Sequence, residues 1–336
     1  MLPGTTQAIK ISGGNQTNPH VDCNLTSYTE DDFQGASRIS YYDFATNTNH
    51  VVPGNSLDLL SDISGSKIAF TEVDWDGDHI LVYDTVSEST TVIPSWGRSR
   101  PSIGGNLIAF EDRSFSNASE ISIYDLTTGM VSRLTNDSLL DQVPAVSPTG
   151  NAVVWEKCQN NVTGCDIFSA IQTSAGTFQT QLLTGAGEDR WPRTNGDLVV
   201  YVSNKSGEND IYFQRVGGGT EMHLSIPGDQ RWPTISGDLI SFESGTPGDY
   251  DIFVYDLSTG SLYQVTNTHT RGSPRHSAIS ACATASGALS TPFRARETSM
   301  STPSRSRFRV QPRTRSTISS RWSTASTCLR ELRTVS

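Results

Sequence analysis

The chain has 336 residues, 35% of them hydrophobic, and a formal net charge of −10, and it is long enough to bury a sizeable core in one large or two ordinary domains. Its 28 Gly and 15 Pro separate short runs rich in Thr, Tyr, Val and Ile, which is typical of many short strands joined by turns. No run approaches the roughly 18 apolar residues of a membrane span, and the N-terminus lacks the charged-then-apolar pattern of a signal peptide. We therefore expect no membrane span, and an export signal that is absent or already removed.

The charge is divided unevenly along the chain. Residues 271–336 contain twelve Arg, no Lys and only two acids, Glu297 and Glu331, which gives this segment +10 and leaves −20 for residues 1–270. A surface that negative repels phosphate backbones, so we expect no nucleic-acid partner. It favours cations or basic partners, although an acidic surface also serves solubility alone.

Six repeats of 40-odd residues dominate residues 16–270. Each opens with an x-Pro-x-(Ile/Val) step, with Thr194 at the last position in the fifth, followed by a Gly turn, an apolar strand such as LIAFED, a polar hairpin, a second strand such as EISIYD, and a final strand such as VSRLT. The openings are separated by 42, 40, 43, 48 and 41 residues. The residues in the Pro place are Pro19, Ser61, Pro101, Pro144, Pro192 and Pro233.

Four short strands per repeat are typical of a β-propeller, in which each blade buries two apolar faces by packing against its neighbours. The stretch QAIKISGGN at 7–15 is placed like a lone final strand before the first opening. Such a strand commonly closes a propeller ring, and three more strands would then be needed after Thr270. The sequence predicts an all-β propeller over residues 1–270 with six clear blades, either a six-bladed ring or, as we favour, a seven-bladed design with a damaged last blade.

Residues 271–336 form an irregular tail. Fifteen Ser, nine Thr and twelve Arg make up 36 of its 66 residues, and no apolar period survives, so the segment cannot bury enough surface to offset its chain entropy. The composition changes abruptly in mid-repeat, and Arg, Ser, Thr, Ala and Pro without Lys is what GC-rich codons give when read out of frame. We interpret the tail as disordered or as a frameshift product; binding of RNA or an acidic surface is the alternative.

The hairpins SNKSGENDIYFQ (203–214) and GDYDIFVYDLSTGSLYQVT (248–266), with the Pro-x-x-x-Gly openings, resemble the WD40-like repeats of TolB-type β-propellers. The resemblance covers residues 7 to about 270, and Cys23 departs from it in the place of the first turn Gly. It implies a TolB-like fold and is unspecific for function, because such propellers serve as envelope scaffolds, surface-layer modules, peptidase gating domains and, in one branch, pectin-fragment lyases.

The segment before each Pro place leads into the innermost strand, so its residues are expected to ring the channel mouth. Adjacent blades place Trp191 and Trp232 side by side, preceded by Arg190 and Arg231. Flat aromatic faces beside Arg and Asp suit a sugar, peptide or aromatic ligand. The alternative is that each Trp packs against the neighbouring blade's Pro, with Arg stacked on it. The candidate ligand-binding residues are Trp191, Trp232, Arg190, Arg231, Asp189, Asp141, Asp58, Arg98 and Arg100.

Two loops are candidates for bound metal or a cross-link. VDWDGDH places Asp74, Asp76 and Asp78 at alternate positions, which suits Ca²⁺, although the EF-hand spacing is missing and a solvated turn is the alternative. Cys158 and Cys165 flank the hairpin CQNNVTGC, where paired strands would bring them close enough for a disulfide, which implies an oxidising compartment. No second Cys pair or His lies at zinc-ligand spacing.

Catalytic patterns are few, and we assign no catalytic residue. The six His are scattered, and no H-E-x-x-H, G-x-S-x-G or phosphate loop occurs. Two functions stay open. The first is a non-catalytic binding or scaffold propeller of the bacterial envelope or exterior, periplasmic or secreted and monomeric, that engages a protein or glycan at its channel face. The second is a carbohydrate-active enzyme, a glycoside hydrolase or polysaccharide lyase, with its site at the channel mouth.

Overall fold

Each of the six repeats folds into one antiparallel sheet whose four strands pair in chain order. The computed structural model describes residues 15–267 except 33, 56, 95–96, 115–117, 161–162, 175 and 247–248, and beyond them two short strands, β25 (Ser277–Ala278) and β26 (Arg333–Thr334). Blades 1 to 3 consist of β1 (Asn15–Asp22), β2 (Leu25–Asp31), β3 (Ser37–Asp43), β4 (Thr48–Val51); β5 (Asp58–Ser64), β6 (Lys67–Asp74), β7 (Gly77–Asp84), β8 (Ser89–Val92); and β9 (Arg98–Gly104), β10 (Leu107–Asp112), β11 (Glu120–Asp125), β12 (Met130–Arg133). Blades 4 to 6 consist of β13 (Leu140–Val146), β14 (Ala152–Cys158), β15 (Cys165–Ser174), β16 (Thr177–Leu182); β17 (Asp189–Thr194), β18 (Leu198–Ser203), β19 (Asp210–Arg215), β20 (Met222–His223); and β21 (Asp229–Ser236), β22 (Leu239–Thr246), β23 (Asp249–Asp256), β24 (Ser261–Gln264).

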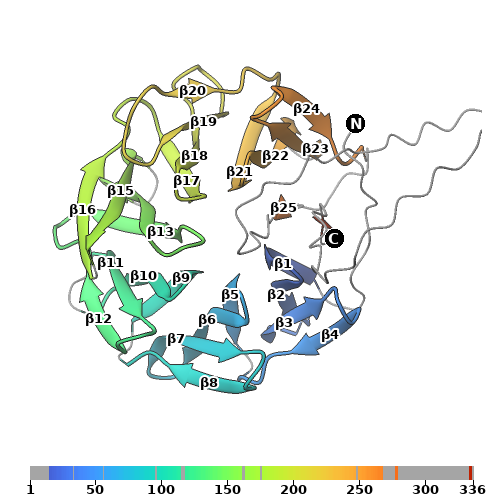
Figure 1. Ribbon diagram of the computed structural model, residues 1–336, viewed down its shortest axis with the longest axis vertical. Coiled ribbons are helices and arrows are strands. Elements are labelled where there is room, and N and C mark those ends of the chain that lie inside the picture. Colours follow the sequence, from blue (N-terminus) through green and yellow to red (C-terminus); the bar gives the residue numbers. More distant parts are fainter. Residues whose placement is uncertain are drawn as a thin grey trace, which may run out of the picture.

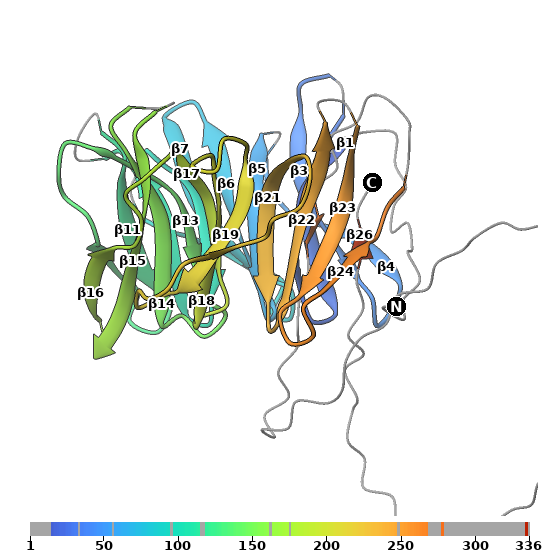
Figure 2. The ribbon, with the colours of Figure 1, turned by 90° about the horizontal axis from the view of Figure 1, so that it is seen from above.

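The blades stand around a common axis with the first strand of each blade innermost (Figure 1), and the strands run roughly along that axis (Figure 2). No described residue is helical, and none of the described part of the chain forms a helix that could cross a membrane. The all-β propeller with six four-stranded blades is therefore confirmed.

The core lies between the blades because each middle strand has a neighbour on both faces. All six residues of β10 are buried, whereas all four residues of the outermost strand β8 are exposed. Five hydrophobic clusters each join two consecutive blades; the cluster between blades 1 and 2 includes Ile39, Val52, Ile63 and Phe70. Since a fully buried side chain of this size stabilises the fold by about 1.5–3 kcal/mol, neighbouring blades hold one another in place.

Blades 6 and 1 are joined differently. No hydrophobic cluster of the described residues links them, and β25 lies between them, in contact with β1, β21 and β22 (Figure 1). The seven-bladed design stays a prediction, because residues 7–14 and most of 271–336 lie outside the described residues, and the domain boundary at residue 270 stays one for the same reason.

Candidate functional site

The residue before the Pro place has a left-handed backbone in all six blades. This conformation is uncommon for residues other than Gly, and for the β-branched Val143 it is an outlier. The register of pairing with the second strand shifts across the same position in every blade, so each position is a β-bulge, which re-aims the side chains around it. Blade 2 keeps the bulge although Ser61 replaces Pro. The six φ values are 50° at Asn18, 55° at Leu60, 52° at Arg100, 51° at Val143, 53° at Trp191 and 53° at Trp232.

Residues three positions before the Pro place are buried within the blades in five of the six repeats, instead of ringing a channel mouth. Arg98 forms an ion pair with Asp112 at 3.3 Å, and Asp141 accepts a hydrogen bond of 2.7 Å from the indole of Trp155. Burial raises the pKa of Asp141 to about 6. The buried residues, each at most 3% exposed, are Asp58, Arg98, Asp141, Asp189 and Gln230.

Hydrogen bonds from the bulges couple consecutive blades. We call the contact between two consecutive blades a joint. At four joints, the backbone N–H of the left-handed residue donates a hydrogen bond to the side chain of the fifth residue in the second strand of the preceding blade. That acceptor is neutral at the first two joints and a buried Glu at the next two; at the fifth joint the equivalent residue is Val202, which has no acceptor. The four bonds are Leu60 to Thr29 (3.2 Å), Arg100 to Thr71 (3.1 Å), Val143 to Glu111 (3.0 Å) and Trp191 to Glu156 (2.6 Å).

Trp191 and Trp232 occupy consecutive bulges and lie side by side, as the sequence predicts. Their ring centroids are 4.3 Å apart with planes inclined by 33°. Both rings line a cavity of about 220 Å³ enclosed by the inner strands of the six blades, and Trp232 is 36% exposed. Their role as ligand-binding residues stays a prediction.

The arginines named with the Trp pair are engaged with carboxylates and do not line this cavity. Arg190 pairs with the buried Glu156 at 3.5 Å. Arg231 pairs with Glu243 at 2.8 Å, and its guanidinium lies 3.5 Å from the ring centroid of Tyr250. Arg100 in blade 3 lies 3.7 Å from the carboxylate of Glu111. These arginines therefore stabilise the blades rather than face the cavity.

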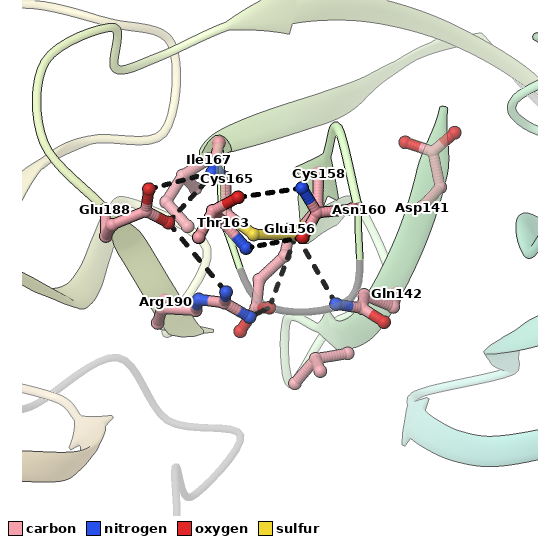
Figure 3. The surroundings of a disulfide bond; sticks show 12 residues. Asp141, Gln142, Glu156, Cys158, Asn160, Thr163, Cys165, Ile167, Glu188 and Arg190 are labelled. Carbon is pink, nitrogen blue, oxygen red and sulfur yellow. Dashed lines mark hydrogen bonds and ion pairs between the residues drawn. A yellow bond between two sulfur atoms is a disulfide. The ribbon is translucent and has the colours of Figure 1, made fainter. Parts of the chain in front are cut away.

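A chain of polar contacts leads from the hairpin of blade 4 to Trp191. Cys158 and Cys165 form a disulfide that closes the hairpin between β14 and β15 (Figure 3), as the sequence predicts. Glu188 accepts a hydrogen bond from the N–H of Gly164 at 2.8 Å and pairs with Arg190 at 3.8 Å.

Glu156 completes this chain, because its two oxygens contact Arg190 and the N–H of Trp191. Burial raises the pKa of Glu156, although the bond from Trp191 and the charge of Arg190 oppose that increase. The cross-linked hairpin and the channel Trp thus share one network.

The residue directly after the Pro place lines the cavity in every blade, and sequence reasoning missed this set. The bulge interrupts the strand alternation, so the residue after the Pro place reaches the axis in every blade, whereas the residue directly before it lines the cavity in blades 1, 5 and 6 alone. The sequence signal for this set was the variable residue between the Pro place and the following Ile or Val. The six residues are His20, Asp62, Ser102, Ala145, Arg193 and Thr234.

The carboxylate of Asp62 contacts three groups from the two neighbouring blades, blades 1 and 3. Its carboxylate lies 2.9 Å from Nδ1 of His20 and accepts hydrogen bonds from the hydroxyl of Ser102 at 2.8 Å and the N–H of Ile103 at 2.9 Å. Burial alone would raise its pKa, but the charge and hydrogen bond of His20 and the two further donors outweigh burial and lower the pKa of Asp62.

Arg193 lines the same cavity from blade 5. Its Nη1 donates to the carbonyl oxygen of Pro192 at 3.0 Å, and within the described residues it forms no ion pair at 4.0 Å or less. Burial lowers the pKa of the guanidinium, while the more distant charges of Asp62 and Glu156 raise it. The cavity therefore combines the satisfied carboxylate of Asp62 with a cation, Arg193, that has no close counter-charge among the described residues.

The aspartates considered for calcium lie in the β6–β7 hairpin, away from this cavity. Asp76 pairs with His79 at 2.9 Å, and Oδ1 of Asp74 accepts the N–H of Trp75 at 2.6 Å. Across the described ranges, the group of three candidate ligand atoms within 4.8 Å of one another is Glu156, Cys158 and Cys165, two of which are joined as a disulfide. Calcium binding by Asp74, Asp76 and Asp78 stays a prediction.

By sequence, no protein-family model and no curated protein matches the chain. By structure, it is similar to TolB from Acinetobacter baumannii, with a TM-score of 0.52 and 18% identity over 71% of this chain and 62% of that protein. It thus spans less than two thirds of the length of that TolB.

Two further solved structures are similar to the chain. The β-propeller domain of the Trilobed protease from Pyrococcus furiosus, which has an open velcro topology, gives a TM-score of 0.59 and 11% identity over 80% of this chain and 89% of that domain. An oligogalacturonate lyase in complex with manganese gives a TM-score of 0.57 and 12% identity over 80% of this chain and 87% of the lyase. At these identities the similarity establishes the fold, and the same fold occurs in proteins of different function.

Proposed function

We propose that this chain, a TolB-like β-propeller by fold, is a non-catalytic binding or scaffold module that engages a protein or glycan partner at its channel face. The observation that carries the proposal is the Trp191–Trp232 pair, whose adjacent, mutually tilted rings line the central cavity. Large rings at the rim of a concave site give contact area at low entropy cost, and aromatic residues commonly dominate the energy of binding surfaces.

The groups around the cavity favour binding over acid–base catalysis. A general acid needs a pKa near the working pH, whereas the pKa of Asp62 is lowered. Asp22, the other carboxylate that lines the cavity, accepts the N–H of Gly65 at 2.7 Å. Both carboxylates thus accept hydrogen bonds that join neighbouring blades.

The enzyme alternative rests on the similarity to a lyase bound to manganese. Among the described residues that line the cavity, His20 is the single His, and it is paired with Asp62. One His beside a satisfied Asp is a weak basis for a divalent metal site, because such sites gather several ligands. The binding module is therefore the better supported function.

We place the protein in the periplasm or outside the cell, as a monomer. The Cys158–Cys165 disulfide supports this location, since disulfides persist in oxidising compartments. The location is testable by fractionating cells that express the native gene with a C-terminal epitope.

The test of the binding function is a glycan and peptide array probed with the full chain and with Trp191→Ala and Trp232→Ala. We expect bound partners to be lost, by at least tenfold in affinity, in both variants. Trp75→Ala is the matched control, because Trp75 is 91% exposed on the β6–β7 hairpin and does not line the cavity. Partners retained by both channel variants would remove the Trp pair from the site.

A further inference from the structure

Arg193 differs from the other arginines of the blades. The described residues between 15 and 267 include nine arginines, and seven of them have a carboxylate within 4.0 Å. Arg215 is exposed to solvent on β19, whereas Arg193 is partly buried in the cavity wall. Removing a guanidinium from water without a counter-charge is unfavourable. A position that breaks this rule is where a ligand group is expected to supply the missing charge.

The free edge of Arg193 suits a planar anion. Its Nη1 donates to Pro192, which leaves Nε and Nη2, the edge that binds a carboxylate through two parallel hydrogen bonds. Thr234, the residue after the Pro place in the next blade, lines the cavity beside it and adds a hydroxyl. Trp191 and Trp232 lie on the same two blades and line the same cavity as Arg193.

The remaining charges of the cavity restrict the anion to a single negative charge. Asp22 and Asp62 also line it, and like charges in a partly desolvated site repel a doubly charged group such as phosphate or sulfate. The cavity volume of about 220 Å³ is below the usual range for a drug-sized ligand. One small acid, or one terminal residue of a longer ligand, is therefore the size that fits.

We propose that the cavity binds a carboxylate whose planar or apolar body lies against the Trp191–Trp232 pair and whose oxygens accept hydrogen bonds from Arg193. The inference rests on the proposed binding function and names the part of the partner that enters the channel. The same chemistry has two sources, a free small organic acid and the C-terminal residue of a peptide.

The probe is 4-fluorobenzoate, with neutral 4-fluorobenzamide as its isosteric control, observed by ¹⁹F NMR with the full chain. We expect the benzoate to bind and the benzamide to bind at least tenfold more weakly. Arg193→Gln, which keeps most of the side-chain volume, is expected to weaken benzoate binding at least tenfold. Arg193→Lys keeps the charge without the planar fork and is expected to lie between the two.

Arg215→Gln is the matched variant. Arg215 is the other arginine between residues 15 and 267 for which the structure describes no ion pair, and it does not line the cavity. Its replacement is expected to leave benzoate binding unchanged. Equal binding of benzoate and benzamide, an unchanged affinity in Arg193→Gln, or tighter binding of inorganic phosphate than of benzoate would each overturn the inference. Circular dichroism of the variants establishes that they fold.

The source is distinguished with a peptide that ends in Phe, measured as free acid and as C-terminal amide. Binding of the acid at least tenfold tighter than that of benzoate assigns a chain terminus, and binding no tighter than that of benzoate assigns a free acid. Failure of this inference is separable from failure of the proposed function. A partner whose binding requires Trp191 and Trp232 but not Arg193 would overturn the inference of carboxylate binding and leave the proposed binding function intact.

Discussion

The two sides of the channel share a backbone but differ in how their polar groups are satisfied. In blades 1 to 3, His20, Asp62 and Ser102 bind one another, so the wall is complete by itself. In blades 5 and 6, the same position after the Pro place holds Arg193 and Thr234, beside two partly exposed Trp rings. The difference teaches that the same bulge, repeated six times, can satisfy polar groups on one side of the channel and leave them facing the cavity on the other.

Blade 4 supports the ligand-facing side, and the largest effect is expected there. Glu156→Ala removes the acceptor for Trp191 and leaves Arg190 without its buried partner. Breaking a buried ion pair from one side costs about 3–5 kcal/mol, so we expect a fall in Tm of roughly 10 °C for a chain of this size, measured by calorimetry.

The equivalent neutral joint is the control for that change. Thr71→Val removes the acceptor for the N–H of Arg100 without exposing a buried charge, and a neutral hydrogen bond contributes about 1 kcal/mol. Equal losses in Thr71→Val and Glu156→Ala would mean that the charged joint of blade 4 is no stronger than the neutral joint of blade 3.

The blades followed from sequence because their determinants are local. Gly turns, alternating apolar strands and the Pro place recur within each repeat, and the hairpin between Cys158 and Cys165 brings its own ends together. The adjacency of Trp191 and Trp232 followed too, since equivalent positions of consecutive blades are neighbours in any propeller.

The directions in which the side chains around the Pro place point could not be predicted from the sequence, because no particular residue type marks the bulge. Asn, Leu, Arg, Val and Trp all occupy the left-handed position, and most of these residues are poor indicators of positive φ. Without the bulge, the residues before the Pro place were expected at the channel mouth and those after it were overlooked. The partner of Arg190, Glu156, belongs to another blade, 34 residues away, which no local pattern predicts.

A smaller effect is expected for the disulfide, which lies one step further from Trp191. The two Cys are seven residues apart, and closing a loop of that length stabilises the folded state by about 2–3 kcal/mol. The double variant Cys158→Ser, Cys165→Ser is expected to lower the free energy of unfolding by that amount in denaturant melts without reductant. A loss below about 1 kcal/mol would indicate that the bonds of Glu188 hold the hairpin by themselves.

Blade 2, on the side of the channel where His20, Asp62 and Ser102 bind one another, also contains a buried acid that opposes folding at high pH. Burial, followed by the charge of Glu72, raises the pKa of Asp58 to about 7. The folded chain therefore holds a proton that the unfolded chain releases between about pH 4 and pH 7, and the free energy of unfolding falls as pH rises through this window.

Asp58→Asn removes that fall, so we expect it to stabilise the protein by up to about 4 kcal/mol at pH 8 and by almost nothing near pH 4. The matched change is Asp84→Asn, at a half-buried carboxyl whose pKa is lowered by the N–H of Val86, and it is expected to destabilise slightly at pH 8. Thermal melts across this pH range measure both, and a gain for Asp58→Asn that is independent of pH would contradict the assigned pKa.

The smallest effect on stability is expected for Arg193→Met, and it distinguishes the two sides of the channel most directly. Arg193→Met keeps the length of the side chain and removes a cation that has no carboxylate within 4.0 Å among the described residues. Replacing a desolvated charge by an apolar group is commonly neutral or stabilising, so we expect a gain of about 0.5–1 kcal/mol, a rise in Tm of roughly 1–3 °C. A group that lowers stability in the empty protein and raises affinity when a ligand is present is what distinguishes a binding wall from a structural one. A loss of more than about 1 kcal/mol in calorimetry would instead place Arg193 with the structural arginines.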